Sequence, residues 1–214
     1  MAKSPFRIIV LGPPGSGKGT QAVALAKRFR IPHISTGDIF RSHIKRRSLT
    51  GKTVARLLRT GTLVPDTLVN GIVQKRLSQS DCKRGFVFDG YPRTIQQAQY
   101  LQRTFPPSLV ILLELPDREV VRRISGRRLA PDGTIYHLEY KPPPASLRKK
   151  LIQRDDERPF VVRHRLKEYR ILTKPLIRWY ADKGILERID GRPSIATIAQ
   201  RIARTLSRRL ATSS

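Results

Sequence analysis

The stretch G-P-P-G-S-G-K-G-T at residues 12–20 follows the apolar run F-R-I-I-V-L at residues 6–11 and decides the fold. A short, branched apolar run that ends at glycine predicts a buried strand, and residues 20–30 have the apolar spacing of a helix. A strand, the pattern G-x-x-x-x-G-K and a helix form, in this order, the setting of a phosphate-binding loop. Its glycines let backbone N–H groups point at an anion, and Lys18 adds a mobile charge at the positive end of the helix.

The rest of the chain repeats the alternation of strand and helix. Strands are predicted at residues 7–11, 33–35, 85–89, 109–115 and 185–189. Helices are predicted to start near Thr36, Pro65, Pro116 and Ser194, with a further one bracketed by Gly51 and Gly61. The last of them is predicted to share one apolar side among Ile195, Ile198, Ile202 and Leu206. This alternation indicates the α/β class, a three-layer core in which helices cover both faces of a parallel sheet.

One segment, residues 126–158, breaks the alternation. It contains P-D-G-T at 131–134, I-Y-H-L-E-Y at 135–140 and P-P-P at 142–144. A turn, an alternating strand and a run of prolines indicate a small hairpin-built insertion that projects from the core.

The charge of the chain is unusual. Lys and Arg number 43 against 16 Asp and Glu in 214 residues, a net charge of +27. Such a field attracts nucleotides, nucleic acid or anionic lipid, without choosing among them. The single cysteine, Cys82, excludes an intrachain disulfide, favours a reducing compartment such as the cytoplasm, and is expected to be a buried apolar residue. No apolar run is long enough to span a bilayer, and a strand that begins by about Phe6 leads us to expect no signal peptide.

Several motifs together resemble one family. G-P-P-G-S-G-K-G-T-Q, S-T-G-D at 35–38 and D-G-Y-P-R at 89–93 resemble the adenylate kinase family of nucleoside monophosphate kinases. The resemblance continues, in the family's order, through G-R-R (126–128), I-Y-H (135–137), Q-R-D-D-E (153–157), R-H-R-L (163–166) and D-G-R-P (190–193). It implies a P-loop core at 1–34, 65–126 and 166–214, an AMP-binding helical insertion at 35–64, and a small β-rich lid at 127–165.

The resemblance also implies the reaction ATP + AMP = 2 ADP and the residues that carry it. The expected catalytic residues are Lys18, Arg93, Arg127, Arg154 and Arg165. The expected ATP-binding residues are Gly15, Ser16, Gly17, Lys18, Gly19, Thr20, Arg123, Arg127, Tyr136, His137 and Arg192. The expected AMP-binding residues are Thr36, Arg41, Leu63, Val64, Gly90, Arg93, Gln97, Arg154 and Arg165. Arginine forks suit phosphate oxygens. In so basic a chain any one arginine taken alone is better interpreted as a solvated surface residue, and its place in a family motif is what favours the functional role.

Metal binding is expected to be indirect. Gly19 stands where a phosphate loop usually has Ser or Thr, so the hydroxyl that often meets Mg²⁺ is displaced to Thr20. Asp89, at the end of a strand, is expected to orient the water shell of Mg²⁺ that arrives with ATP; the alternatives are a helix cap or a partner for Lys18. Zinc is not expected, because the family lids that bind it use four cysteines and this insertion has none.

The sequence leaves alternatives open for the substrates and the binding partners. The amide of Gln97 can donate to and accept from an adenine edge at once, which with a long insertion favours AMP over CMP or UMP. The insertion departs from the family's long lids at A-S-L-R-K-K-L-I (145–152), which is shorter and basic. A GTP:AMP phosphotransferase would share the fold and the acceptor motif. A kinase-fold protein that also binds nucleic acid would account for the charge, although no RNA-binding motif or aromatic platform accompanies it. A monomer is what the resemblance implies.

Overall fold

A five-stranded parallel sheet forms the centre of the molecule, which is described here from a computed structural model over residues 5–211. The strand order is β2-β3-β1-β4-β7. The strands are β1 (Phe6–Leu11), β2 (His33–Ser35), β3 (Gly85–Asp89), β4 (Leu109–Glu114) and β7 (Leu186–Asp190). All five predicted strands and their parallel arrangement are confirmed. Val10 of β1 pairs with Asp89 of β3, so the phosphate loop and Asp89 emerge at the same edge of the sheet.

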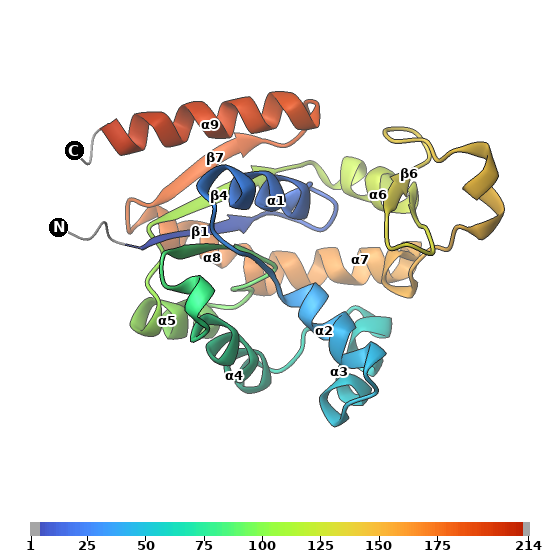
Figure 1. Ribbon diagram of the computed structural model, residues 1–214, viewed down its shortest axis with the longest axis horizontal. Helices are drawn as coiled ribbons and strands as arrows, with labels where there is room; N and C mark the ends of the chain where they lie inside the picture. Colours follow the sequence, from blue (N-terminus) through green and yellow to red (C-terminus); the bar gives the residue numbers. More distant parts are fainter. Residues whose placement is uncertain (1–4, 212–214) are drawn as a thin grey trace.

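Helices cover both faces of this sheet (Figure 1). One face carries α1 (Lys18–Phe29) and α9 (Ile195–Ala211). The other carries α4 (Asp66–Leu77), α5 (Ile95–Thr104) and α8 (Pro175–Ala181). Two further helices are α6 (Asp117–Ser125) and α7 (Pro159–Glu168), and a π-helical turn at Tyr169–Thr173 joins α7 to α8. A 3-10 turn at Ser80–Cys82 precedes β3.

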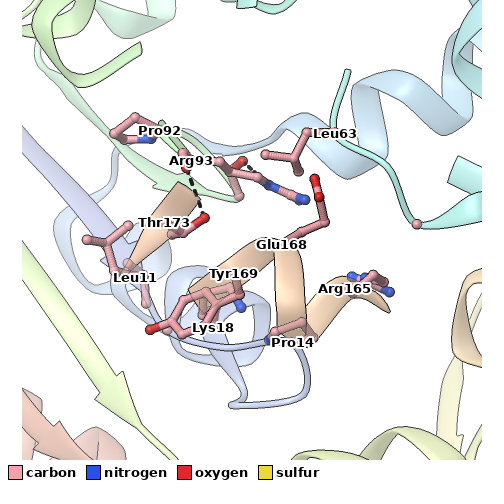
Figure 2. A pocket seen from close by; sticks show the side chains of 14 residues that line it. Leu11, Pro14, Lys18, Leu63, Pro92, Arg93, Arg165, Glu168, Tyr169 and Thr173 are labelled. Atoms are coloured by element: carbon pink, nitrogen blue, oxygen red, sulfur yellow. Dashed lines mark hydrogen bonds between the residues drawn. The ribbon is translucent and has the colours of Figure 1, made fainter. Parts of the chain in front are cut away.

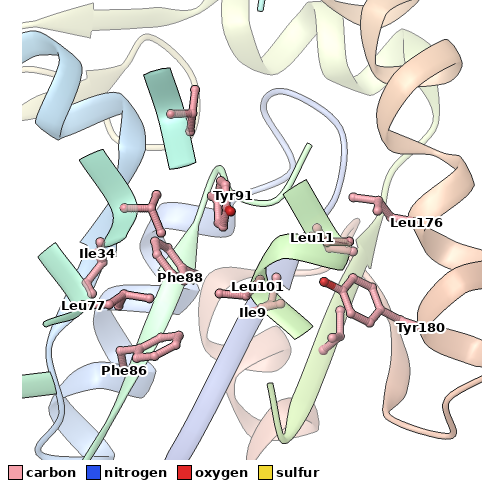
Figure 3. Close-up of a cluster of buried hydrophobic side chains, with 14 of the residues drawn as sticks. Ile9, Leu11, Ile34, Leu77, Phe86, Phe88, Tyr91, Leu101, Leu176 and Tyr180 are labelled. Atoms are coloured by element: carbon pink, nitrogen blue, oxygen red, sulfur yellow. The ribbon is translucent and has the colours of Figure 1, made fainter. Parts of the chain in front are cut away.

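The alternation of side chains along β1 divides the core into two clusters. Ile8 and Val10 pack with the residues of α1 and α9, whereas Ile9 and Leu11 pack on the opposite side with Phe88 (Figure 3). Successive side chains of a strand point to opposite faces, so a strand covered on both faces must be apolar at every position. The unbroken apolar run at residues 8–11 follows from this burial.

Two insertions extend from the core (Figure 1). The first is the helix pair α2 (Thr36–Lys45) and α3 (Leu49–Thr60). The second contains the antiparallel strands β5 (Arg127–Leu129) and β6 (Ile135–His137), followed by 3-10 turns at Ala145–Lys150 and Asp155–Glu157. Ile152 forms a further bridge to Leu129. The predicted hairpin is therefore confirmed, with an added third segment.

Two local predictions are wrong. Gly51 does not precede a helix but lies inside α3, where a Cβ atom would come within 2.2 Å of the backbone oxygen of His43. Glycine is needed there for the close approach of α2 and α3 rather than for helix ending. Ile195 does not share the buried side of α9, because it sits in the first turn of that helix and is 62% exposed. Cys82 is buried, as expected.

Gly51→Ala is expected to lower the free energy of unfolding by about 3 kcal/mol, because the added methyl group overlaps the backbone of α2. Gly71→Ala is the matched control, since a Cβ at this helical position meets no atom within 4 Å. The control should gain about 0.5–1 kcal/mol from helix propensity. Urea denaturation measures both, and equal stability of the two variants would contradict the packing described for Gly51.

Candidate functional site

The phosphate loop, residues 12–19, connects β1 to α1. Gly17 caps α1 with a φ of 89°, a left-handed conformation that other residues rarely adopt. Ser16 is fully buried in the loop, and its hydroxyl has no hydrogen-bond partner in the protein. A buried hydroxyl without a partner is costly, so the loop is ready to donate to a bound anion. Of the predicted loop residues, Thr20 alone is exposed.

Gly19 lies against a carboxylate. A Cβ atom at this position would be 3.1 Å from Oδ2 of Asp89. A serine or threonine side chain would therefore crowd the carboxylate at the end of β3. This proximity gives the glycine after Lys18 a structural reason, and it places Asp89 beside the loop as the sequence predicts.

The side chain of Lys18 is held by the backbone of its own loop. Its Nζ donates to the backbone oxygen of Pro13 at 2.8 Å. Burial lowers the pKa of Lys18 to about 7, the nearby Asp89 opposes this shift, and Arg93 and Arg165 add to it. The charged form of Lys18 is therefore destabilised in the free protein, and a bound anion would stabilise it.

Arginines from three separate elements meet near this lysine. Arg93 follows β3, Arg165 lies on α7 and Arg127 begins β5. Burial, followed by repulsion from Arg165, lowers the pKa of Arg93 to about 10. Burial also lowers the pKa of Arg127, whose guanidinium lies 3.8 Å from Glu157. Arg165 is paired with the carboxylate of Asp156 at 2.9 Å.

One cavity, called the loop cavity, contains part of this cluster (Figure 2). Lys18, Arg93 and Arg165 line it. Arg127 is close enough for its charge to lower the pKa of Lys18, although it is not among the lining residues. Arg154 lines neither cavity and acts at longer range on Arg127.

The loop cavity also has walls that the sequence analysis missed. Glu168, Tyr169 and Thr173 come from the end of α7 and the π-helical turn (Figure 2). The hydroxyl of Thr173 donates to the backbone oxygen of Arg93 at 2.9 Å and so supports the arginine. A proline at the first position of α7, followed by a run of apolar residues, was a usable signal for this helix.

Another cavity, called the acceptor cavity after the predicted AMP-binding residues in its lining, lies between the core and the α2–α3 insertion. Every predicted AMP-binding residue except Arg154 lines it, namely Thr36, Arg41, Leu63, Val64, Gly90, Arg93, Gln97 and Arg165. Thr36 donates to the backbone oxygen of Gly90 at 3.0 Å, which joins α2 to the end of β3. Arg41 pairs with Asp38 at 2.5 Å.

The residues predicted to hold the ATP base gather outside both cavities. Arg123 donates to the backbone oxygens of Gly191 and Arg192 at 2.8 and 2.9 Å. The ring of His137 lies 4.5 Å from that of Tyr140, and Arg123 lies over the same tyrosine. Burial lowers the pKa of His137. Lys141 lies over the ring of Tyr136 on the same hairpin.

Within residues 5–211, no three His, Cys, Asp or Glu side chains gather as a metal-binding group. None of the described helices is long and apolar enough to cross a membrane.

The parallel sheet, the phosphate loop and the converging arginines define a phosphotransferase of the P-loop class that handles nucleotides. A family model described as adenylate kinase matches residues 10–185. The adenylate kinase of Caldanaerobacter subterraneus is 44% identical over 212 residues, which cover 94% of this chain and 96% of the relative. That of Thermotoga maritima is 43% identical over 211 residues, with 93% and 96% covered. That of Methanothrix thermoacetophila is 41% identical over 213 residues, with 95% and 99% covered. The chain belongs to the adenylate kinase family.

Binding of Mg-ATP at pH 8 is expected to take up about one proton. The pKa of Lys18 near 7 leaves it mostly neutral at this pH in the free protein, and the charge of the phosphates raises that pKa. Arg93, with a pKa of about 10, stays charged throughout. Calorimetry in buffers of different ionisation enthalpy measures the uptake. Lys18→Arg is the control that should abolish it, and equal uptake by both proteins would contradict the assignment to Lys18.

Proposed function

We propose that this protein catalyses ATP + AMP = 2 ADP at the junction of the two cavities. The observation that carries the proposal is that the loop cavity and the acceptor cavity share Arg93 and Arg165. ATP phosphates in the loop cavity would meet the AMP phosphate where these two arginines lie. Family membership and the names of the relatives support the same reaction.

The chemistry is direct transfer. A phosphate oxygen of AMP attacks the γ phosphorus of ATP as the bond to the β-phosphate oxygen breaks, so two ADP molecules result. Lys18, Arg93, Arg127, Arg154 and Arg165 stabilise the charge that spreads over the transferred group. Arg93 is prepared for this role, because its Nε donates to the backbone oxygen of Gly90 at 2.8 Å and its own backbone is held by Thr173.

Magnesium, as the family uses it, would come bound to ATP and would neutralise charge on its phosphates. The chain offers Asp89 beside the loop, and one carboxylate suits a cation that keeps most of its waters. Asp89 would thus orient the water shell rather than form a cage.

The proposal also assigns a role to each part of the chain. Residues 1–34, 65–126 and 166–214 would form the core, 35–64 the AMP-binding part and 127–165 a lid. Arg123, Tyr136, His137 and Arg192 would enclose the ATP base when the lid closes. The separate β5–β6 hairpin supports a lid of its own. We also propose that the protein is monomeric and cytoplasmic. Sedimentation of the purified protein tests the monomeric state.

The function is tested by a matrix of ATP or GTP with AMP, CMP, UMP or GMP, with and without Mg²⁺, followed by separation of the products. Formation of ADP from ATP and AMP, dependent on Mg²⁺, is the expected result. Preference for GTP would make the protein a GTP:AMP phosphotransferase with the same acceptor cavity. Transfer to none of the acceptors by folded protein would contradict the proposal.

Arg93→Ala is expected to lower kcat by about a hundredfold to a thousandfold, since it removes a preorganised donor from the transferred group. Arg103→Ala is the matched control, because Arg103 is an exposed residue in the last turn of α5. Steady-state kinetics and circular dichroism measure activity and fold. Near-normal turnover of the Arg93 variant would contradict its role.

A second property concerns the charge. Residues 39–65 contain no acidic residue and seven cations, which are Arg41, Lys45, Arg46, Arg47, Lys52, Arg56 and Arg59. All of them except Arg41 are exposed on the α2–α3 insertion. We propose that this surface attracts nucleic acid without sequence preference.

Binding of a single-stranded RNA is expected to weaken steeply as salt rises, because counterions are released. Fluorescence anisotropy at several salt concentrations measures it, with Lys52→Glu/Arg56→Glu as the test variant and Arg103→Glu as control. A shallow salt dependence, or equal loss in both variants, would contradict this surface.

A further inference from the structure

The amide of Gln97 is held at both of its ends. Its Oε1 accepts from the backbone N–H of Arg93 at 2.7 Å, and its Nε2 donates to Oδ1 of Asp66 at 2.7 Å. A backbone N–H can only donate and an ionised carboxylate can only accept. The reversed amide would set donor against donor and acceptor against acceptor. Gln97 therefore has a single permitted orientation.

Asp66 is itself held by its second oxygen. Oδ2 accepts from the hydroxyl of Thr94 at 2.6 Å, and that hydroxyl oxygen accepts from the backbone N–H of Gln97 at 3.1 Å. Asp66 begins α4 directly after the segment that carries Leu63 and Val64, whereas Thr94 caps α5. The carboxylate thus ties one wall of the acceptor cavity to the helix that carries Gln97.

The fixed amide leaves one N–H and one lone pair for a ligand. Gln97 is only 2% exposed and lines the acceptor cavity, so these groups face a site rather than bulk water. Adenine presents an acceptor at N1 and a donor at its 6-amino group. A 6-oxopurine presents the reverse, a donor at N1–H and an acceptor at O6. An amide free to turn over could pair with either base, whereas a fixed amide pairs with one and leaves buried groups unpaired with the other.

We propose that Asp66 is a positioning residue for selection of the acceptor base: together with the backbone of Arg93 it holds Gln97 in the orientation that accepts a 6-aminopurine and rejects a 6-oxopurine. The inference rests on the proposed function, since it assigns the acceptor cavity to AMP. It extends that function by giving a carboxylate outside the cavity lining control over which purine monophosphate is phosphorylated.

The test compares AMP with IMP as acceptor at saturating Mg-ATP. Asp66→Asn replaces an obligate acceptor by a group that can donate or accept, so it removes one of the two constraints on Gln97. The ratio of kcat/KM for AMP to that for IMP should fall about tenfold, the equivalent of one charge-assisted hydrogen bond. The change should lie in the two acceptor KM values, with kcat for AMP and KM for ATP altered by less than about twofold.

Two further comparisons separate positioning from folding. Asp81→Asn makes the same chemical change in the 3-10 turn that follows α4, where Asp81 pairs with Arg76 at 2.7 Å, and it should leave the ratio unchanged. Thr94→Val removes the hydroxyl that holds Asp66 and should lower the ratio, whereas Thr94→Ser keeps the hydroxyl and should preserve it. The two Thr94 variants test the inference if the Asp66 variant does not fold.

The inference is overturned by an unchanged ratio in Asp66→Asn, or in Thr94→Val where the Asp66 variant is unfolded. It is equally overturned if kcat falls by the same factor for both acceptors, because that indicates a purely structural role. Wild-type protein that transfers no phosphate to AMP contradicts the proposed function. Wild-type protein that does so, beside variants with an unchanged ratio, contradicts this inference alone.

Discussion

Burial of several cations beside one another is the constraint on which the site depends. Burial lowers the pKa values of Lys18, Arg93 and Arg127, and repulsion from Arg165 adds to each of these shifts. On flexible loops these side chains would move apart into water, because hydration stabilises each charge. The chain instead anchors its cations on the phosphate loop, the segment after β3, the β5–β6 hairpin and α7. Keeping these charges out of water lowers the stability of the free protein. Bound phosphates recover this free energy as binding energy.

Three carboxylates stabilise this cluster of cations without neutralising its charge. Asp89 opposes the desolvation of Lys18, Asp156 pairs with Arg165, and Glu157 lies near Arg127. The latter two stand in the 3-10 turn at Asp155–Glu157, so the partners of two arginines belong to an insertion rather than to the sheet. Under the proposed assignment of this insertion as a lid, its position and the charge balance in the site would be coupled. This coupling would favour closure of the proposed lid around a polyanionic pair of nucleotides.

Much of this could be read from the sequence, for reasons that differ from residue to residue. The run at residues 8–11 predicts a buried strand because both of its faces are covered, and the glycines of the loop predict a phosphate site. The acceptor residues came from motifs rather than from periodicity. The contacts of Asp66 with Gln97 and of Thr173 with Arg93 could not be predicted, because each joins segments distant in the chain. Gly51 was misread for the same reason, since its neighbour is the backbone of α2.

In the proposed site, two nucleotides bind end to end across Arg93 and Arg165. The most direct measurement is calorimetric titration with two adenosines joined by five phosphates, a single molecule able to fill both cavities. One molecule should bind per chain, and both Lys18→Met and Gln97→Leu should weaken that same event, since one residue lies at each end of the joined cavities. Two molecules bound per chain, or binding weakened by only one of the two substitutions, would contradict a single site shared by donor and acceptor.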